Sequence, residues 1–223
     1  MSTLERTPTP ARPPGAKPAK PYALAARELL RETLFDAARG ELEHRAWSEV
    51  TMADVAAAAG VSRQTLYKEF GSRDEFAQAF VLREADGFIA TVEGALDAHL
   101  DDPQAALTAA FGLFLSAAAE DPLIRAVIGG SPEMLPFLTT QGQTLVHGAT
   151  ERLSIAITER WPAVAGHDAQ LLAECLVRLA ISYAALPAGP TAMTAASMTT
   201  LLGPYIERVL AGELKPVPAR DYP

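Results

Sequence analysis

The side chains with the most distinctive chemistry lie together in the segment 62–70, SRQTLYKEF. Arg63 can bond a guanine with both arms of its guanidinium, Gln64 can bond an adenine, and the methyl group of Thr65 can contact thymine. Lys68 adds a cation to the same segment. The segment therefore carries side chains that can read base edges, although a stretch this short, taken alone, fits an ordinary solvated helix face better.

Residues that could perform catalysis or bind a metal do not cluster in the sequence. His44, His99 and His167 are far apart and show no ligand spacing with Cys175. No glycine-rich phosphate loop, paired carboxylates or nucleophile elbow is present. We therefore expect no enzyme, no cofactor and no metal. An all-helical enzyme or carrier acting on a small hydrophobic molecule is the alternative, but it needs a constellation of titratable groups that the sequence does not show.

Capping signals place the segment 62–70 on the second of two short helices. Thr51-Met-Ala-Asp54 is a capping box that opens a helix over residues 51–59, and Gly60 suits the left-handed position after it. Ser62 caps the following helix. Two short helices joined by a glycine-containing turn form a helix-turn-helix. The apolar residues expected to hold them together are Val55, Ala56, Val61 and Leu66.

A resemblance to the TetR family of transcriptional regulators is carried by residues 34–76, LFDAARGELEHRAWSEVTMADVAAAAGVSRQTLYKEFGSRDEF. It implies a three-helix DNA-binding domain at residues 22–71, followed by a helical domain for ligand binding and dimerisation. The matching elements, at the offsets that the family shows, are Thr51-Met-Ala-Asp-Val-Ala, Ala59-Gly-Val-Ser62, Thr65-Leu-Tyr67, Phe70 and Ser72-Arg73.

The resemblance also implies roles for individual residues. Tyr67 would bind a phosphate through its hydroxyl, and Arg73 would bind another. Free backbone amides at a helix start near Ser72 suit a phosphate as well. The residues expected to contact double-stranded DNA are Thr51, Ser62, Arg63, Gln64, Thr65, Tyr67, Lys68, Ser72 and Arg73.

Three residues depart from the family's usual pattern. Ala46 stands where a glycine is usual, so the turn after the first helix is expected to differ. Trp47 replaces a commoner Tyr or Phe and is expected to pack in the core. Glu69 occupies a position that is often His or Tyr, and a carboxylate there repels phosphate. We expect Glu69 to point away from DNA, with Arg73 as one possible partner.

The net charge of −8 is unevenly distributed. Residues 1–80 contain 11 Lys and Arg against 11 Asp and Glu, whereas residues 81–223 contain 8 against 16. The acidity therefore belongs to the second part of the chain, and a locally neutral segment can bind DNA if its cations share one face. A protein that packages DNA without regard to sequence usually carries excess positive charge, so that class is disfavoured.

The sequence predicts an all-α fold of about nine helices, with no strand pattern and no internal repeat. Helical periodicity and the Pro and Gly residues that interrupt it set the expected boundaries. The expected helices cover residues 22–45, 51–59, 62–70, 72–100, 103–120, 122–130, 140–160, 168–186 and 191–210, with a loop at 131–138. The expected domains are a disordered basic arm at 1–21, a helix-turn-helix domain at 22–71, a ligand-binding and dimerisation domain at 72–212, and a flexible tail at 213–223.

Two uncharged stretches raise the question of a membrane. Residues 103–119 are short for a span and carry Gln, Thr and Ser, and residues 179–206 are interrupted by prolines. Both are better interpreted as buried helices. The lone Cys175 forms no internal disulfide and the N-terminus shows no apolar signal region, so we expect a cytoplasmic protein without membrane contact.

Apolar residues spaced along three of the expected helices are candidates for a ligand cavity, because the resembled family encloses one in this region. The expected ligand is a small hydrophobic effector, such as a fatty-acid derivative or a lipophilic drug. His147 could orient a polar group of it. The pocket candidates are Phe88, Phe111, Phe114, Leu115, Leu145 and His147.

A homodimer is expected because one helix-turn-helix reads too few base pairs for specificity in a genome. A two-fold dimer reads a palindromic operator with recognition helices about 34 Å apart. The last two helices would supply a self-complementary apolar surface and form a four-helix bundle. The interface candidates are Leu172, Cys175, Leu179, Tyr183, Met198, Leu202, Tyr205 and Val209. The sequence thus predicts a ligand-responsive repressor that leaves DNA when an effector binds.

Overall fold

A computed structural model describes residues 22–128, 142–187 and 189–210. Within these ranges the chain forms helices and no strand, as the sequence predicts. The predicted basic arm, the loop at 131–138 and the tail at 213–223 lie outside the described residues. The helices are α1 (Tyr22–Leu42), α2 (Met52–Ala58), α3 (Arg63–Phe70), α4 (Arg73–Asp97), α5 (Pro103–Glu120), α6 (Pro122–Ile128), α7 (Gly142–Arg160), α8 (Gly166–Ala185) and α9 (Thr191–Leu210), with a 3-10 turn at Trp47–Glu49.

The short helices begin where their capping residues predict. The Thr51 hydroxyl accepts a hydrogen bond from the Asp54 amide at 3.2 Å, and the Asp54 carboxylate accepts one from the Thr51 amide at 2.9 Å. The Ser62 hydroxyl accepts from the Thr65 amide at 3.0 Å. These bonds satisfy amide groups that a helix leaves free at its first turn. The sequence therefore fixes the starts of α2 and α3 locally.

The cap at the start of α4 is simpler than the capping box at the start of α2. The Ser72 hydroxyl accepts from the Glu75 amide at 3.1 Å, but the Ser72 amide donates to the Phe70 carbonyl instead of the Glu75 side chain. The reason is the tight turn at Gly71, which has a φ of 80°. A side chain at this position would strain the backbone, and the Glu75 carboxylate would have to move away from it. Gly60, with a φ of 70°, ends α2 in the left-handed conformation that the sequence predicts.

An aromatic core holds the N-terminal helices together. Phe35, Phe70, Phe76 and Phe80 are buried, and Trp47 packs with them as predicted. Neighbouring ring centroids in this group are 4.9–6.5 Å apart. Ala46, at the departure from the family pattern, adopts an extended backbone with a φ of −69°, so the first helix is followed by the short 3-10 turn that carries Trp47 into the core.

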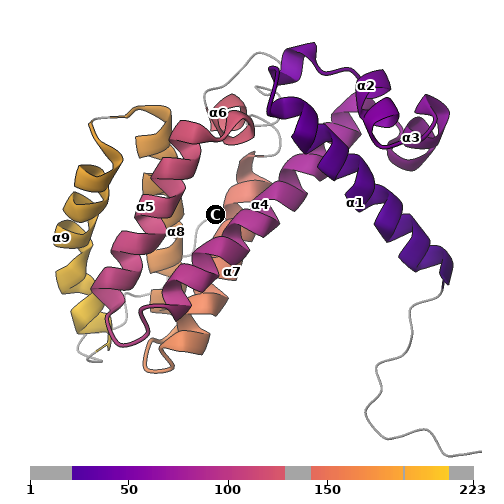
Figure 1. Ribbon diagram of the computed structural model, residues 1–223. Helices are drawn as coiled ribbons and strands as arrows, with labels where there is room; N and C mark the ends of the chain where they lie inside the picture. The colour runs from indigo at the N-terminus through magenta and orange to yellow at the C-terminus, as the bar shows by residue number, and fades with distance from the viewer. Residues whose placement is uncertain (1–21, 129–141, 188, 211–223) are drawn as a thin grey trace, which may run out of the picture.

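The long helix α4 joins the two ends of the molecule (Figure 1). Its first half packs in the aromatic core with α1 and α3, and its second half packs on α5 and α7. Helices α7 and α8 pack together, as do α5 and α9. The buried residues of this second part form several smaller clusters instead of one continuous core. The arrangement leaves room between the helices of the second part.

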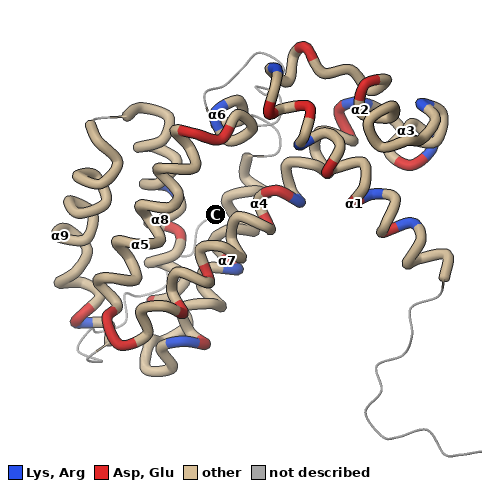
Figure 2. The backbone as a smooth tube through the Cα atoms, in the orientation of Figure 1, with Lys and Arg blue, Asp and Glu red and all other residues tan. Residues whose placement is uncertain are grey.

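The charged residues are unevenly distributed among the helices (Figure 2). Lys, Arg, Asp and Glu alternate along α1 and around α3, whereas α5 carries charge only at Glu120 and α9 only at Glu207 and Arg208. Helices with so little charge are buried on most sides or packed against a partner.

Candidate DNA-binding surface and internal cavity

The N-terminal part of α3 presents its polar side chains to solvent. Ser62, Arg63, Gln64 and Lys68 are exposed, and Thr65 is half-buried. Leu66 on the opposite side of the helix is fully buried. The structure therefore gathers the side chains that can read base edges on one outward face, which borders a shallow depression.

Tyr67 and Arg63 lie side by side on this face. The Arg63 guanidinium carbon lies 5.2 Å from the centroid of the Tyr67 ring, and an Arg63 nitrogen lies 3.5 Å from the Tyr67 hydroxyl. Stacking on an aromatic ring restricts an arginine without neutralising it. Arg63 is thus oriented before any ligand arrives.

The other residues predicted to contact DNA are engaged within the protein. The Thr51 hydroxyl donates to Asp54 at 2.7 Å, and Ser72 caps α4. Arg73 donates to the Trp47 carbonyl at 2.8 Å, and its guanidinium carbon lies 5.4 Å from the centroid of the Trp47 ring. Arg73 therefore ties the start of α4 to the aromatic core.

Glu69 on α3 pairs with two arginines of α1, not with Arg73. The Arg27 Nε lies 2.8 Å and the Arg31 Nη1 lies 3.0 Å from the same Glu69 oxygen. Arg31 also lies over the Phe70 ring, with its guanidinium carbon 4.4 Å from the centroid. The Glu69 side chain is only 10% exposed. It therefore fastens α3 to α1, an arrangement that the sequence does not show because the partners are 42 and 38 residues away.

A large cavity lies among the helices of the second part. Its volume is about 1260 Å³, and its wall is formed by residues of α4, α5, α6, α7 and α8, with further residues from α1 and α9. Apolar side chains predominate, among them Leu107, Leu153 and Leu176. Of the six predicted pocket residues, Phe88, Phe111, Phe114, Leu145 and His147 line the cavity. Leu115 does not; it is buried in the core between α5, α8 and α9.

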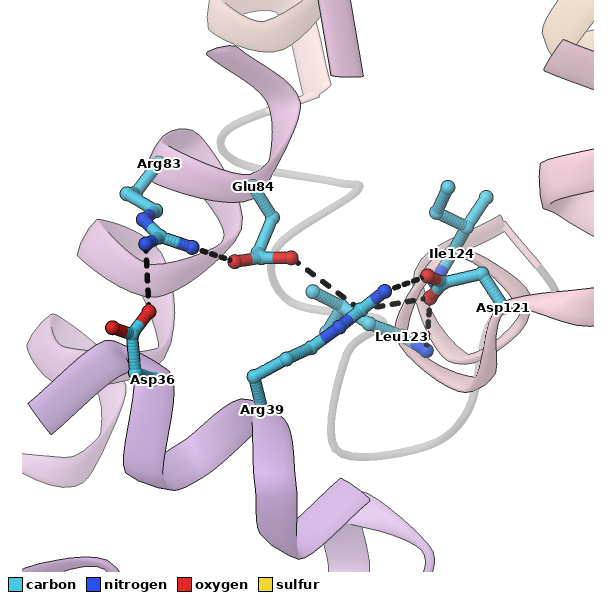
Figure 3. Close-up of polar contacts among 7 residues, drawn as sticks. All are labelled: Asp36, Arg39, Arg83, Glu84, Asp121, Leu123 and Ile124. Carbon is cyan, nitrogen blue, oxygen red and sulfur yellow. Dashed lines mark hydrogen bonds and ion pairs between the residues drawn. The ribbon is translucent and has the colours of Figure 1, made fainter. Parts of the chain in front are cut away.

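The end of the cavity that faces the aromatic core carries a cluster of ion pairs (Figure 3). Arg39 of α1 makes two hydrogen bonds to the Asp121 carboxylate, one of them at 3.1 Å, and its Nη1 lies 3.4 Å from Glu84 of α4. The Arg83 Nη1 lies 2.6 Å from the carboxylate of the same Glu84, and the Arg83 Nη2 lies 2.7 Å from the carboxylate of Asp36 on α1. The cluster thus joins α1, α4 and the start of α6.

Both partners of the Arg39–Asp121 pair are held in their charged forms. Burial alone raises the pKa of the Asp121 carboxyl, since it removes water from the anion. The hydrogen bond from Arg39, the amides of Ile124 and Leu123 and the charge of Arg39 outweigh burial, so the pKa of Asp121 lies below its ordinary value. The hydrogen bond to Asp121 likewise raises the pKa of Arg39. The pair is therefore ionised at neutral pH.

The predicted dimer residues of α8 and α9 fall into two groups. Leu172, Met198 and Val209 are buried inside their own protomer, because these faces of the helices pack on α5 and α7. Leu179, Tyr183, Leu202 and Tyr205 are half-buried, and Cys175 is exposed. The sequence did not indicate which apolar side chains are exposed here: Leu171 on α8, Leu186 directly after it, and Met193 and Leu201 on α9.

Neither a metal cluster nor a spanning helix occurs in the described ranges. No three His, Cys, Asp or Glu side chains there are grouped as a metal would require. No single described helix is long and apolar enough to cross a membrane; α5 and α6 reach that composition only together, and a bend of 92° separates them.

Two family models match the chain. Residues 34–80 match bacterial regulatory proteins, tetR family, and residues 102–204 match bacterial tetracyclin repressor, C-terminal domain. The HTH-type transcriptional regulator AlkX of Mycobacterium tuberculosis (strain ATCC 25618 / H37Rv) is 40% identical over 190 residues, which cover 84% of this chain and 90% of that relative.

Solved structures share the fold. The TetR family repressor AlkX from Dietzia sp. strain DQ12-45-1b, implicated in biodegradation of n-alkanes, is 38% identical with a TM-score of 0.71, over 81% of this chain and 96% of that one. RolR in complex with the ligand resorcinol is 22% identical with a TM-score of 0.56, over 88% of this chain and 98% of that one.

Proposed function

This chain belongs to the TetR family of bacterial transcriptional regulators, and we propose that it is a homodimeric repressor that leaves a palindromic operator when a long apolar molecule fills its cavity. The observation that carries the proposal is the position of α6. This helix lines the cavity and also packs into the aromatic core beneath the recognition helix. Binding to chromosomal DNA would place the protein in the cytoplasm.

The outward face of α3 is the proposed reader of DNA sequence. Arg63, Gln64 and Thr65 would contact base edges, whereas Lys68 and the Tyr67 hydroxyl would contact phosphates. Thr51, Ser72 and Arg73 would act at the edge of this surface through backbone amides and the half-buried guanidinium.

The test separates the two kinds of contact. Tyr67→Phe keeps the packed ring and removes the hydroxyl, so it should weaken binding about equally on all sequences. Arg63→Ala should relax the preference at particular base pairs, at a cost of roughly 1–3 kcal/mol. The affinity for DNA would be measured by fluorescence anisotropy, on the genomic DNA fragment to which the protein stays bound and on variants of that fragment with single base changes. Binding of both variants like wild type would show that α3 is not the reader.

The proposed effector is a long-chain alkane or an oxidised derivative of one. The cavity of about 1260 Å³ exceeds the range of roughly 300–1,000 Å³ that holds most drug-sized ligands, and its wall is mostly apolar. The relative from Dietzia is implicated in n-alkane biodegradation, which gives this chemistry a biological setting.

A pair of variants tests the cavity. Ala110 lines it and Ala119 on the same helix is exposed to solvent. Ala110→Trp should fill space and abolish release of operator DNA by hexadecane, hexadecanol or hexadecanoic acid, while DNA binding itself persists. Ala119→Trp should respond like wild type. Release by glucose or nucleotides alone would contradict an apolar effector.

The proposed dimer forms through the outer faces of α8 and α9. Leu171, Cys175 and Leu201 are exposed there, with Leu201 at 64%. Leu201→Glu should give helical monomers that no longer bind the operator, since burying a charge in an interface is costly. Met198→Glu, which places the charge in the protomer's own core, should lose helical structure instead. Sedimentation and circular dichroism distinguish the two results; a wild-type monomer at micromolar concentration would refute the dimer.

A further inference from the structure

Helix α6 belongs to two environments at once. Leu123 and Val127 are buried in the same apolar cluster as Phe35, Phe76 and Phe80. The same two residues also line the cavity. A molecule that fills the cavity therefore presses on side chains that are part of the core under the recognition helix.

Asp121 performs two tasks at the start of this helix. Its Oδ1 accepts hydrogen bonds from the amides of Leu123 at 2.8 Å and Ile124 at 3.1 Å, and so caps α6. Its two oxygens also accept hydrogen bonds from the two terminal nitrogens of Arg39 (Figure 3). Because one carboxylate makes both sets of bonds, α6 cannot shift without changing its attachment to α1.

The pair is placed where an effector can act on it. Arg39, Glu84 and Asp121 all line the cavity. The Arg39 side chain is 35% and the Asp121 side chain 15% exposed, so the pair is neither fully solvated nor deeply buried. Partly exposed pairs have modest energies, which suits a contact that must open and close. The Glu84 carboxylate also lies 3.4 Å from the Arg39 Nη1, so Arg39 has a second anion beside it if its bonds to Asp121 break.

We propose that the Arg39–Asp121 pair couples the cavity to the recognition helix: it closes in the DNA-binding form and opens when an effector displaces α6. The proposal rests on the function proposed above, since it takes the cavity as the effector site. Arg39 and Asp121 are then positioning residues that touch neither the bases nor, of necessity, the effector.

Linkage gives the proposal a distinctive signature. If the pair stabilises the DNA-binding form, its loss shifts the equilibrium toward the effector-binding form. Operator affinity then falls and effector affinity rises. A merely structural pair would weaken both, or change neither.

Three variants and one control test this signature. Asp121→Asn keeps the helix cap, because an asparagine oxygen accepts amide hydrogen bonds as well, but removes the charge that Arg39 binds. Arg39→Gln removes the other partner, and the double variant completes a cycle. Asp97→Asn is the matched control. Asp97 accepts two hydrogen bonds from Arg160, at 2.8 and 2.9 Å, and this pair joins α4 to α7 without contacting α1.

Two dissociation constants are measured for the full-length dimer, one for the retained operator fragment and one for Nile red, an uncharged lipophilic dye that fluoresces in apolar cavities. Both single variants should bind operator at least about fivefold more weakly and should bind the dye about fivefold more tightly. A fivefold change lies at the lower end of the affinity changes that coupling between two sites typically produces. The double variant should match the single ones within about twofold, and Asp97→Asn should match wild type. Circular dichroism confirms folding.

The outcomes are separable. Wild-type protein that binds neither dye nor any of the long-chain compounds refutes the proposed effector site, and the coupling with it. The coupling alone is refuted if wild-type protein binds the dye and releases operator in response to the long-chain compounds, but the variants do not show the expected opposite changes. Their affinities for operator and dye would then stay within about twofold of wild type, or both would weaken.

Discussion

The aromatic core under the recognition helix and the helices around the cavity are built in opposite ways. In the first region, Phe35, Phe70 and Phe76 form a continuous contact network with ring centroids 4.9–5.7 Å apart. In the second, the aromatic residues meet in isolated pairs, such as Phe88 with Phe114 at 5.7 Å. Alanines and threonines fill much of the remaining surface of these helices.

The difference follows from what each region must do. A surface that is proposed to read base edges must hold its side chains in a fixed geometry, which close packing and the ion pairs of Glu69 with Arg27 and Arg31 favour. A region that takes up a molecule must leave volume unfilled and must forgo the dispersion contacts that would fill it. The start of α4 therefore lies in a closely packed region, whereas its other end lies in a region that gives up packing contacts to leave a cavity.

The largest effect that would test this contrast is on core packing. Phe76→Ala should destabilise the protein by about 3–5 kcal/mol, because Phe76 is fully buried among aromatic rings. Phe114→Ala should cost less than about half of that, since one side of the ring already faces the cavity. Urea unfolding measures both. Equal losses would mean that the cavity wall is packed as tightly as the core.

A smaller effect with an informative sign is expected at the recognition helix. Glu69→Gln removes a negative charge near DNA, which by charge alone should strengthen binding. We expect operator binding to weaken instead, by about 1 kcal/mol, because Arg27 and Arg31 no longer fix α3. Asp74, an exposed carboxylate at the first turn of α4, supplies the control, and Asp74→Asn should bind equally or more tightly. Tighter binding of the operator by Glu69→Gln would show that Glu69 does not position α3.

Thr150 tests the loosely packed region. Its hydroxyl is buried and makes no hydrogen bond in the described structure. By contrast, the Thr108 hydroxyl lies 2.9 Å from the Gln104 carbonyl oxygen and 2.6 Å from the Thr199 hydroxyl, and is hydrogen-bonded to both. Thr150→Val should therefore stabilise the protein by roughly 0.5–1 kcal/mol, whereas Thr108→Val should destabilise it by a similar amount. Thermal melts of the two variants give the comparison; destabilisation by both would show that Thr150 has a partner.

The smallest effect concerns acid. The pKa of Asp121 lies below its ordinary value, so this carboxylate stabilises the folded state above the unfolded pKa of about 3.9, and the contribution disappears as pH falls through the lower folded pKa. The difference in unfolding free energy between wild type and Asp121→Asn should be constant from pH 7 to 5 and shrink below about pH 4. A difference that grows on acidification would mean that Asp121 is protonated more readily when folded.

The sequence determined the features that depend on near neighbours along the chain. Thr51, Ser62 and Gly60 act on groups within a few residues of themselves, so the recognition segment and its family could be identified without coordinates. The burial of Trp47 was also predicted correctly, and five of the six predicted pocket residues line the cavity. The family resemblance indicated the region of the cavity, and the spacing of apolar residues along the helices indicated the candidates.

Only the tertiary structure decided which distant residues meet. Arg39 and Asp121 are 82 residues apart, and no local pattern marks either one as a partner of the other. Periodicity likewise selected Leu172 and Met198 as an interface, although they pack inside their own protomer while Leu171 and Leu201 face outward. A hydrophobic pattern records that a face is covered; whether its own domain or a second chain covers it depends on how the helices are packed around the cavity, and that packing is set by contacts between residues far apart in the sequence.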